Sequence, residues 1–226
     1  MAGVSIPARL SAAWRRRDMA TTATEVITEA GSDAEPGFRP HRMTVDRYER
    51  LIEAGVFGSK DPVFLWRRRL VERMTPGQPR VFVVSTLLQA FLRLVPDGWY
   101  TLQGQPIAVG DLSMPEPDLS VVRGTIRDYL ERRPTAARDV ALVIEVSDST
   151  LKADSGEVLR AYAAEGVPVY WIVNIPRSRA VVHGNPTGPS DAPDYREHRE
   201  YGPDDEIPVV LDGVEVGRVA AREILP

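Results

Sequence analysis

The sequence predicts an α/β fold in which a mixed central sheet is flanked by helices. Residues 139–146 and 167–173 are near-continuous apolar runs, which is typical of strands in the interior of a sheet. Between them, residues 150–165 have the spacing of an amphipathic helix, and Ser149 or Thr150 can cap its N-terminus. The apolar stripe of this helix consists of Leu151, Val158, Leu159 and Tyr162.

The first half of the chain supplies two helices and a hairpin. Residues 43–55 predict a helix that Thr44 caps and Gly55 ends. Residues 63–74 predict a hairpin with a basic turn, and residues 81–95 predict a long apolar helix that is buried. The other predicted elements are a strand over 99–109, a strand over 117–122, a short polar helix or loop over 125–133, a strand over 179–184, a loop over 184–194 and a hairpin over 206–219.

The composition suits one domain of ordinary size. The chain has 226 residues, of which 43% are hydrophobic, enough for a substantial core. It contains no cysteine, which excludes disulfides and thiolate metal sites, and its three histidines lack the spacing of a zinc site. No apolar run approaches the roughly 18–20 residues that span a bilayer, so we expect a cytoplasmic protein without a membrane partner.

Residues 1–40 differ in composition from the rest of the chain. Their first part, MAGVSIPARLSAAWRRR, is rich in arginine and lacks acidic residues, a composition that a transit peptide can also have. The alternative, which we favour, is a disordered or over-extended N-terminus. On that interpretation the folded domain comprises residues 41–226.

Two carboxylates occur in strand-like apolar segments, Asp118 in PEPDLSVVRG and Glu145 in ALVIEVSDST. An ionised carboxylate in such a segment is costly unless it is paired, and two of them side by side repel each other unless a cation lies between them. Mg²⁺ or Mn²⁺ suits this position, because hard divalent ions bind one or two carboxylates together with water and phosphate. The alternative is that Asp118 is a strand-start residue and that Glu145 pairs with an arginine.

These segments, followed by GVPVYWIVN, resemble the Uma-type putative restriction endonucleases of bacteria, which belong to the PD-(D/E)XK nuclease superfamily. The resemblance runs from about Met43 to the C-terminus. It implies a restriction-endonuclease-like fold and a Mg²⁺-dependent endonuclease that cleaves DNA. It also implies that Asp118, Glu145 and the backbone carbonyl near Val146 hold the metal.

The chain departs from the family pattern at several catalytic positions. Phe64 takes the place of a hairpin glutamate, Val81 that of a histidine, and Val158 that of a lysine on the helix after Glu145. In the plainer form of the superfamily the lysine lies two residues after the glutamate, where this chain has a serine. We therefore expect a catalytically weakened enzyme. Lys152, on the first turn of the same helix, is the candidate substitute, and a solvated lysine is the alternative.

Arg67, Arg68 and Arg69 form a compact cationic turn beside Trp66. Guanidinium groups suit phosphate and an indole can stack on a base, so this turn is a candidate DNA contact. The alternative is a solvated turn with one arginine paired to Glu72.

Tyr170 and Trp171 are candidate core or subunit-contact residues, and we expect a homodimer. Two further hypotheses stay open beside the nuclease. The chain could be a non-catalytic nucleic-acid-binding or regulatory relative that kept the fold, or an interaction module that dimerises.

Overall fold

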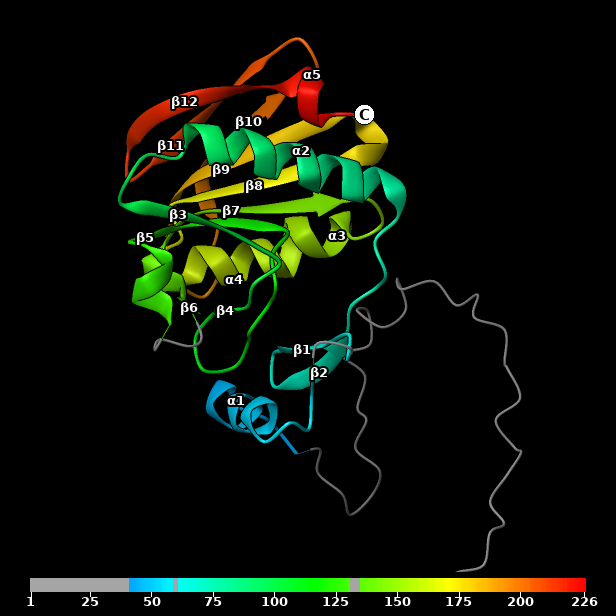
Figure 1. The fold of residues 1–226 in the computed structure, drawn as a ribbon, viewed down its shortest axis with the longest axis vertical. Helices are drawn as coiled ribbons and strands as arrows, with labels where there is room; N and C mark the ends of the chain where they lie inside the picture. The colour runs from blue at the N-terminus through cyan, green and yellow to red at the C-terminus, as the bar shows by residue number, and fades with distance from the viewer. Residues whose placement is uncertain (1–40, 59–60, 131–134) are drawn as a thin grey trace, which may run out of the picture. The chain divides into compact units, whose positions relative to one another are not determined.

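The computed structural model describes residues 41–58, 61–130 and 135–226 (Figure 1). Residues 1–40, whose interpretation as a disordered or over-extended N-terminus is given above, lie outside the described residues. Lys60 and residues 131–133 of the segment predicted over 125–133 lie outside them as well. None of the described helices is long and apolar enough to cross a membrane.

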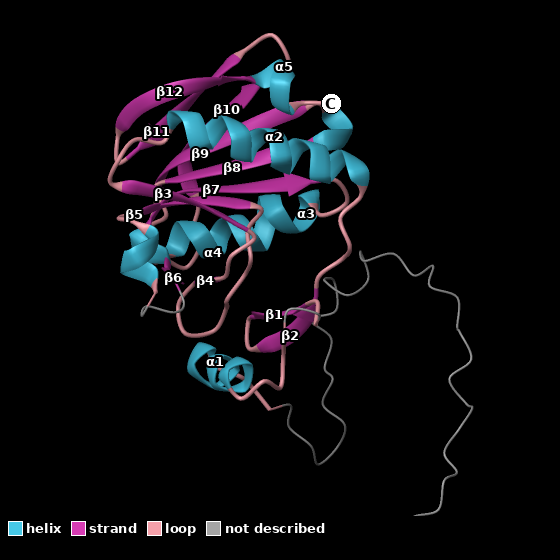
Figure 2. Ribbon diagram, in the orientation of Figure 1, coloured by secondary structure: helices cyan, strands magenta, loops and turns pink. Residues whose placement is uncertain are grey.

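A mixed six-stranded sheet forms the centre of the α/β fold, as the sequence predicts (Figure 2). Its order is β10-β9-β8-β7-β5-β3, in which β7 and β8 are parallel and the other neighbours are antiparallel. Every residue of β7 and β8 is buried, which agrees with their apolar sequences. The bounds of the six strands are β3 (Trp99–Gln103), β5 (Leu119–Arg123), β7 (Val140–Ser147), β8 (Val169–Asn174), β9 (Arg179–Pro186) and β10 (Tyr195–Tyr201).

Helices cover both faces of this sheet (Figure 1). On one face, a core cluster joins α2 to Leu142, Ile144 and Val146 of β7, and Phe91 meets Trp171 edge-on with ring centroids 5.7 Å apart. On the other face, a second cluster joins α4 to the alternate residues of β7 and β8. The helices are α2 (Gln78–Leu94), α3 (Leu151–Ala153), α4 (Leu159–Ala164) and α5 (Ala221–Ile224). A hairpin of β11 (Glu206–Leu211) and β12 (Val214–Ala220) packs with α2 and α5.

A third, smaller cluster ties α1 (Val45–Glu53) to the hairpin of β1 (Val63–Trp66) and β2 (Arg69–Glu72). Its buried members are Val45, Tyr48, Leu65 and Met114. The remaining elements are the short strands β4 (Ile107–Ala108) and β6 (Thr135–Ala136), which pair in parallel, and the 3-10 helices η1 (Ile126–Tyr129), η2 (Ala137–Asp139) and η4 (Ile175–Arg177).

Several element predictions are wrong in detail. The single strand over 99–109 is two strands, because Gly104 has a positive φ of 56° and its N–H bonds back to Pro117 and Asp118. The helix over 81–95 buries only one face, and Val81, Phe82 and Leu92 of α2 are exposed. Strand β10 was not predicted, because its sequence YREHREY exposes charged residues along a sheet edge and lacks apolar alternation. Tyr170 and Trp171 are fully buried within the single chain, which makes them core residues.

The helix predicted over 150–165 is interrupted by one π-helical segment. The chain runs from α3 through the π-helical segment η3 (Asp154–Val158) into α4 without leaving the helix. Such π-helical segments are rare in proteins, and where they occur they are often found at functional sites. Here it follows directly on the strand that carries Glu145.

Candidate functional site

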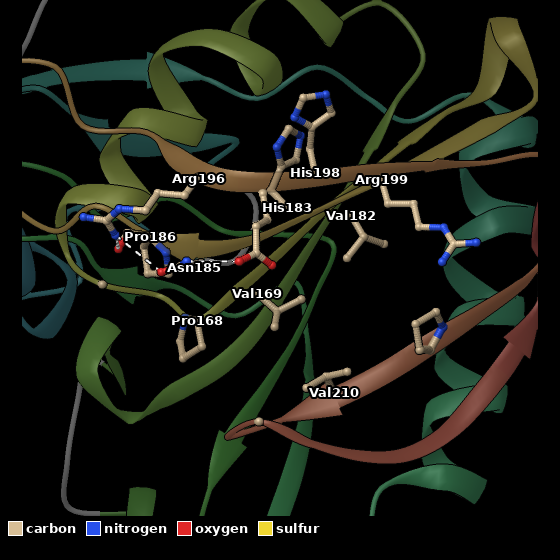
Figure 3. A pocket seen from close by; sticks show the side chains of 15 residues that line it. Pro168, Val169, Val182, His183, Asn185, Pro186, Arg196, His198, Arg199 and Val210 are labelled. Atoms are coloured by element: carbon tan, nitrogen blue, oxygen red, sulfur yellow. Dashed lines mark hydrogen bonds between the residues drawn. The ribbon is translucent and has the colours of Figure 1, made fainter.

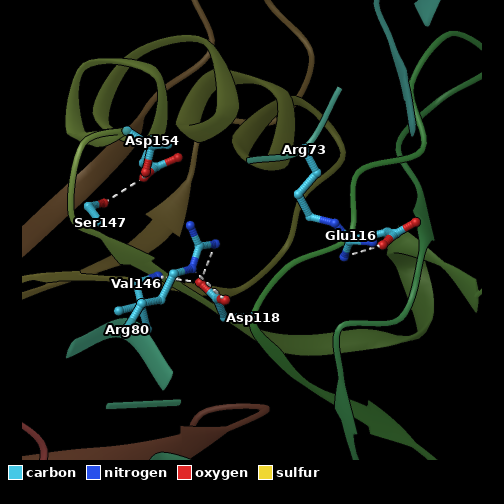
Figure 4. Close-up of polar contacts among 8 residues, drawn as sticks. Arg73, Arg80, Glu116, Asp118, Val146, Ser147 and Asp154 are labelled. Atoms are coloured by element: carbon cyan, nitrogen blue, oxygen red, sulfur yellow. Dashed lines mark hydrogen bonds and ion pairs between the residues drawn. The ribbon is translucent and has the colours of Figure 1, made fainter. Parts of the chain in front are cut away.

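The structure brings Asp118 and Glu145 together at one edge of the sheet. Asp118 directly precedes β5, and the antiparallel pairing of β5 with β7 places Leu119 opposite Ile144. The Asp118 carboxylate accepts a 2.7 Å hydrogen bond from the backbone N–H of Val146 (Figure 4). The start of one strand and the end of its neighbour therefore share a polar site, although 27 positions separate the two carboxylates in the sequence.

The alternation of β7 turns Glu145 toward the helical layer of α3 and α4. Ile144 and Val146 belong to the core cluster on the α2 face, so the residues between and after them point to the opposite face. Ser147, which shares this face, donates a 2.6 Å hydrogen bond to Asp154 in the π-helical segment. Strand β7 thus carries two polar residues on the same face, Glu145 and Ser147, and both point toward the segment that follows the strand.

Asp154 is the third acidic residue of the site. Ser147 and Thr150 both donate 2.6 Å hydrogen bonds to its Oδ2, and Tyr170 donates a 3.0 Å hydrogen bond to its backbone carbonyl. Burial raises the pKa of Asp154, while the two hydroxyl donors and the charge of Arg80 lower it.

The pKa of Glu145 is shifted more strongly than that of Asp154. Burial raises the pKa of Glu145 well above its usual range, and the negative charges of Asp154 and Asp118 raise it further. The charge of Arg80 lowers it. The hydroxyl of Tyr162 is buried near this carboxylate without a hydrogen bond of standard geometry. A further cation beside Glu145 would therefore favour its ionised form.

Arg80 is the site residue that the sequence did not reveal. It lies on the first turn of α2, and its Nε and Nη2 donate hydrogen bonds of 3.0 Å and 2.9 Å to the two oxygens of Asp118 (Figure 4). An arginine does pair with one of the carboxylates, as the alternative interpretation required, but it pairs with Asp118 and not with Glu145. The available signal was a lone arginine at the start of an apolar helix, which is too common a pattern to assign.

The hairpin of β1 and β2 contributes two further ion pairs around the site. Arg67 Nη1 lies 2.9 Å from Glu157 in the π-helical segment, and Arg73 lies 2.6 Å from Glu116, two positions before Asp118. Arg67 and Arg68 form the hairpin turn with positive φ angles. The cationic turn of Arg67, Arg68 and Arg69 therefore stands next to the helical segment that follows Glu145.

Lys152 and Val158 take different positions on that helical segment. Lys152 is exposed and makes no hydrogen bond or ion pair with the part of the chain that the structure describes. Val158 is half-buried and packs against the core cluster of the α4 face. The structure does not bring Lys152 into contact with Asp118 or Glu145.

The donor set fits a hard divalent ion only in part. Asp118, Glu145 and nearby backbone offer oxygen ligands of the kind that Mg²⁺ takes together with water and phosphate. Within the described residues, however, no three His, Asp or Glu side chains form a group that could hold a metal by themselves. Both oxygens of Asp118 already accept hydrogen bonds from Arg80, so a metal would have to share or displace that contact.

A solvent-accessible cavity lies elsewhere, between the β9–β10 hairpin and the β11–β12 hairpin (Figure 3). It has a volume of about 920 Å³ and is open to solvent. Apolar side chains such as Val169, Val182 and Val210 line it together with His183 and His198. None of the three carboxylates of the site lines this cavity, so the cavity is separate from the candidate site.

Comparison with known proteins agrees with this geometry. The family model described as "Uma2: Putative restriction endonuclease" matches residues 45–219. The fold is similar to the crystal structure of "a putative nuclease belonging to DUF820" from Anabaena variabilis ATCC 29413, with a TM-score of 0.60 and 13% identity over 80% of this chain and 97% of that chain. No curated protein matches the chain. The family match spans both carboxylates and the strands that position them, and the chain belongs to the Uma2 restriction-endonuclease family.

Proposed function

We propose that this protein is a Mg²⁺-dependent DNA endonuclease that hydrolyses phosphodiester bonds with reduced efficiency. The family and the fold indicate a nuclease of the restriction-endonuclease type. The observation that carries the finer proposal is the convergence of Asp118 and Glu145 at the adjoining ends of β5 and β7. Two carboxylates held this close in a partly buried site favour a cation between them.

Asp118, Glu145 and the backbone carbonyl of Val146 would hold the Mg²⁺ or Mn²⁺ ion. Such an ion, when bound, lowers the pKa of a coordinated water and neutralises charge on the scissile phosphate. Asp154, fixed by two hydroxyl donors, holds the helical segment against the strand end and adds negative charge behind Glu145. The chain thus supplies an acidic pair at the adjoining ends of two paired strands, β5 and β7, which suits precise positioning.

The basic residues near the site would contact DNA. Arg67, Arg68 and Arg69 lie on a hairpin turn tied to the site through Glu157, so they would approach the phosphate backbone. Lys152 is exposed on the turn after Glu145, and its long side chain would supply the cation that the family lysine provides. Within the described residues Lys152 makes no ion pair with either carboxylate, which accounts for the reduced efficiency in the proposal. Removal of one charge-stabilising donor commonly costs about 10²–10³ in rate.

Calorimetry and DNA nicking test this function. Mn²⁺ should bind the full chain, and Asp118→Ala should abolish the binding. Mg²⁺-dependent nicking of supercoiled plasmid should be slow and should disappear in the same variant. Asp148→Asn is the matched control, because Asp148 is an exposed carboxylate just beyond β7. Binding that persists unchanged in Asp118→Ala would refute the assignment of the metal site.

One observation favours a second candidate, a non-catalytic DNA-binding relative. The guanidinium of Arg80 already neutralises Asp118 through two hydrogen bonds, as a structural ion pair would. On this hypothesis DNA binds without Mn²⁺ and is not cleaved in any divalent metal. DNA affinity and nicking measured side by side separate the two functions.

A further inference from the structure

Arg80 and Asp118 form a two-point contact that uses most of the acceptor capacity of the carboxylate. Arg80 donates to both oxygens, and the N–H of Val146 donates to Oδ2 as well. A carboxylate has about four lone-pair sites, so these three bonds leave little room for another ligand. The side chains of Arg80 and Asp118 are 21% and 12% exposed, which shields the pair from solvent.

Negatively charged groups outnumber positively charged groups around this ion pair among the described residues. Three carboxylates, those of Asp118, Glu145 and Asp154, act on one another electrostatically, and the guanidinium of Arg80 acts on all three. Among the described residues, the guanidinium of Arg80 thus faces three acidic groups. Arg80 holds the position that a divalent ion would otherwise take next to Asp118.

A guanidinium and a divalent ion cannot share this carboxylate at low cost, because they need the same lone pairs and repel each other. We propose that Arg80 is a built-in competitor of the metal ion, and that it exchanges Asp118 for a phosphate group of DNA when the ion binds. This inference rests on the proposed function. It makes Arg80 a phosphate-binding residue of the metal-loaded site, in addition to the role proposed for Lys152.

A phosphodiester is the partner that the chemistry favours for the released guanidinium. The forked N–H groups that now match the two oxygens of Asp118 match two phosphate oxygens equally well. Arg80 lies on the first turn of the 17-residue helix α2, where the helix dipole also favours an anion. Metal binding and DNA binding are then coupled through one side chain, and the coupling is reciprocal.

Calorimetric titration of Mn²⁺ into the full chain measures the competition. Arg80→Gln removes the competitor, so its apparent affinity for Mn²⁺ should be about 10- to 100-fold higher than that of the unaltered protein. Arg73→Gln is the matched control, because Arg73 also pairs with a carboxylate near the site, Glu116, but not with Asp118. Arg80→Lys keeps the charge without the fork and should give an intermediate affinity. It also serves if Arg80→Gln does not fold.

Fluorescence anisotropy with a short labelled DNA duplex measures the exchange. Without metal, Arg80→Gln should weaken DNA binding much less than it does with Mn²⁺, because Asp118 already holds the arginine. With Mn²⁺ present, the same variant should bind DNA about tenfold more weakly. A loss of affinity that is equal with and without Mn²⁺ would overturn the exchange.

The outcomes separate this inference from the proposed function. If Asp118→Asn abolishes Mn²⁺ binding while Arg80→Gln binds Mn²⁺ no more tightly than the unaltered protein, the metal site stands and the competition is overturned. If no form binds Mn²⁺, both fail. Tighter Mn²⁺ binding together with a Mn²⁺-dependent loss of DNA affinity supports the inference.

Discussion

Arg80 and Asp118, which are 38 positions apart, join the first turn of α2 to the first residue before β5 through two hydrogen bonds of 3.0 Å and 2.9 Å. This ion pair lies at the strand ends where the fully buried strand β7 also carries Glu145 and Ser147. It neutralises Asp118, while burial and the charges of Asp154 and Asp118 raise the pKa of the second converging carboxylate, Glu145. The pair therefore decides how much negative charge the site presents to any incoming cation.

The Arg80–Asp118 ion pair should contribute more to the free energy of unfolding than an exposed ion pair does. Arg80→Gln should lower the free energy of unfolding by about 1.5–3 kcal/mol in the absence of metal, because it leaves a shielded carboxylate without its charged donor. In a double-mutant cycle with Asp118→Asn, urea unfolding should give a coupling energy of about 1–3 kcal/mol. The exposed pair of Arg218 and Glu215 is the control and should give below about 1 kcal/mol. Equal coupling in both pairs would contradict the prediction.

Two buried tyrosines on the α4 face should respond differently to loss of the hydroxyl. Tyr170→Phe should destabilise the protein by about 1 kcal/mol, because its hydroxyl donates to the backbone carbonyl of Asp154. Tyr162→Phe should be neutral or stabilising, because its buried hydroxyl lacks a hydrogen bond of standard geometry and lies near Glu145. Thermal and urea unfolding of both variants check this, and a larger loss in Tyr162→Phe would contradict it.

His183 should make stability depend on pH on the acidic side. Burial lowers the pKa of His183 below its usual 6.5, and the neighbouring His198 lowers it further, while Asp194 raises it. The folded state therefore favours the neutral ring. The resulting stabilisation is present above about pH 6.5 and is lost as the pH falls through the lower pKa of the folded state. Unfolding measured between about pH 5 and 8 should depend less on pH in His183→Gln. His41→Gln is the control and should keep the slope of the unaltered protein.

Val158→Lys should raise Mg²⁺-dependent nicking of supercoiled DNA. A lysine at this family position would supply positive charge near the acidic pair, and some stability should be lost because Val158 packs against the α4-face core. Ser155→Lys adds the same charge at an exposed position of the same segment and should leave nicking unchanged. Robust cleavage by the unaltered protein that disappears in Lys152→Ala would show instead that Lys152 already serves. Absence of cleavage in every form, with metal bound, would favour the non-catalytic function.

A shortened protein that begins at Met43 should melt at the same temperature as the full chain. The family match begins at residue 45, and backbone hydrogen bonds of Met43 to Arg68 and of Val45 to Asp111 attach the first described helix to the domain. Differential scanning calorimetry of both proteins checks this prediction. A large drop in melting temperature would show that residues 1–42 contribute to folding.

The sequence by itself predicted the elements whose hydrophobic period is unambiguous. The apolar runs of β7 and β8 predicted buried strands, because only the interior of a sheet buries both faces of a strand. The turn at Asp212-Gly213 predicted the β11–β12 hairpin, and Gly213 has the positive φ that such a turn needs. Asp118 and Glu145 stood out because a carboxylate in an apolar strand conflicts with burial unless another group compensates for it.

The tertiary structure decided what compensates for those carboxylates. Nothing near Arg80 in the sequence distinguishes it from a solvated arginine, because its partner lies 38 positions away and only the packing of α2 on the sheet brings the two together. The same holds for the ion pairs of Arg67 with Glu157 and Arg73 with Glu116. Hydrophobic period is a local property that a sequence records directly. The pairing of charges depends on distances in space, which are set only when the helices dock on the sheet.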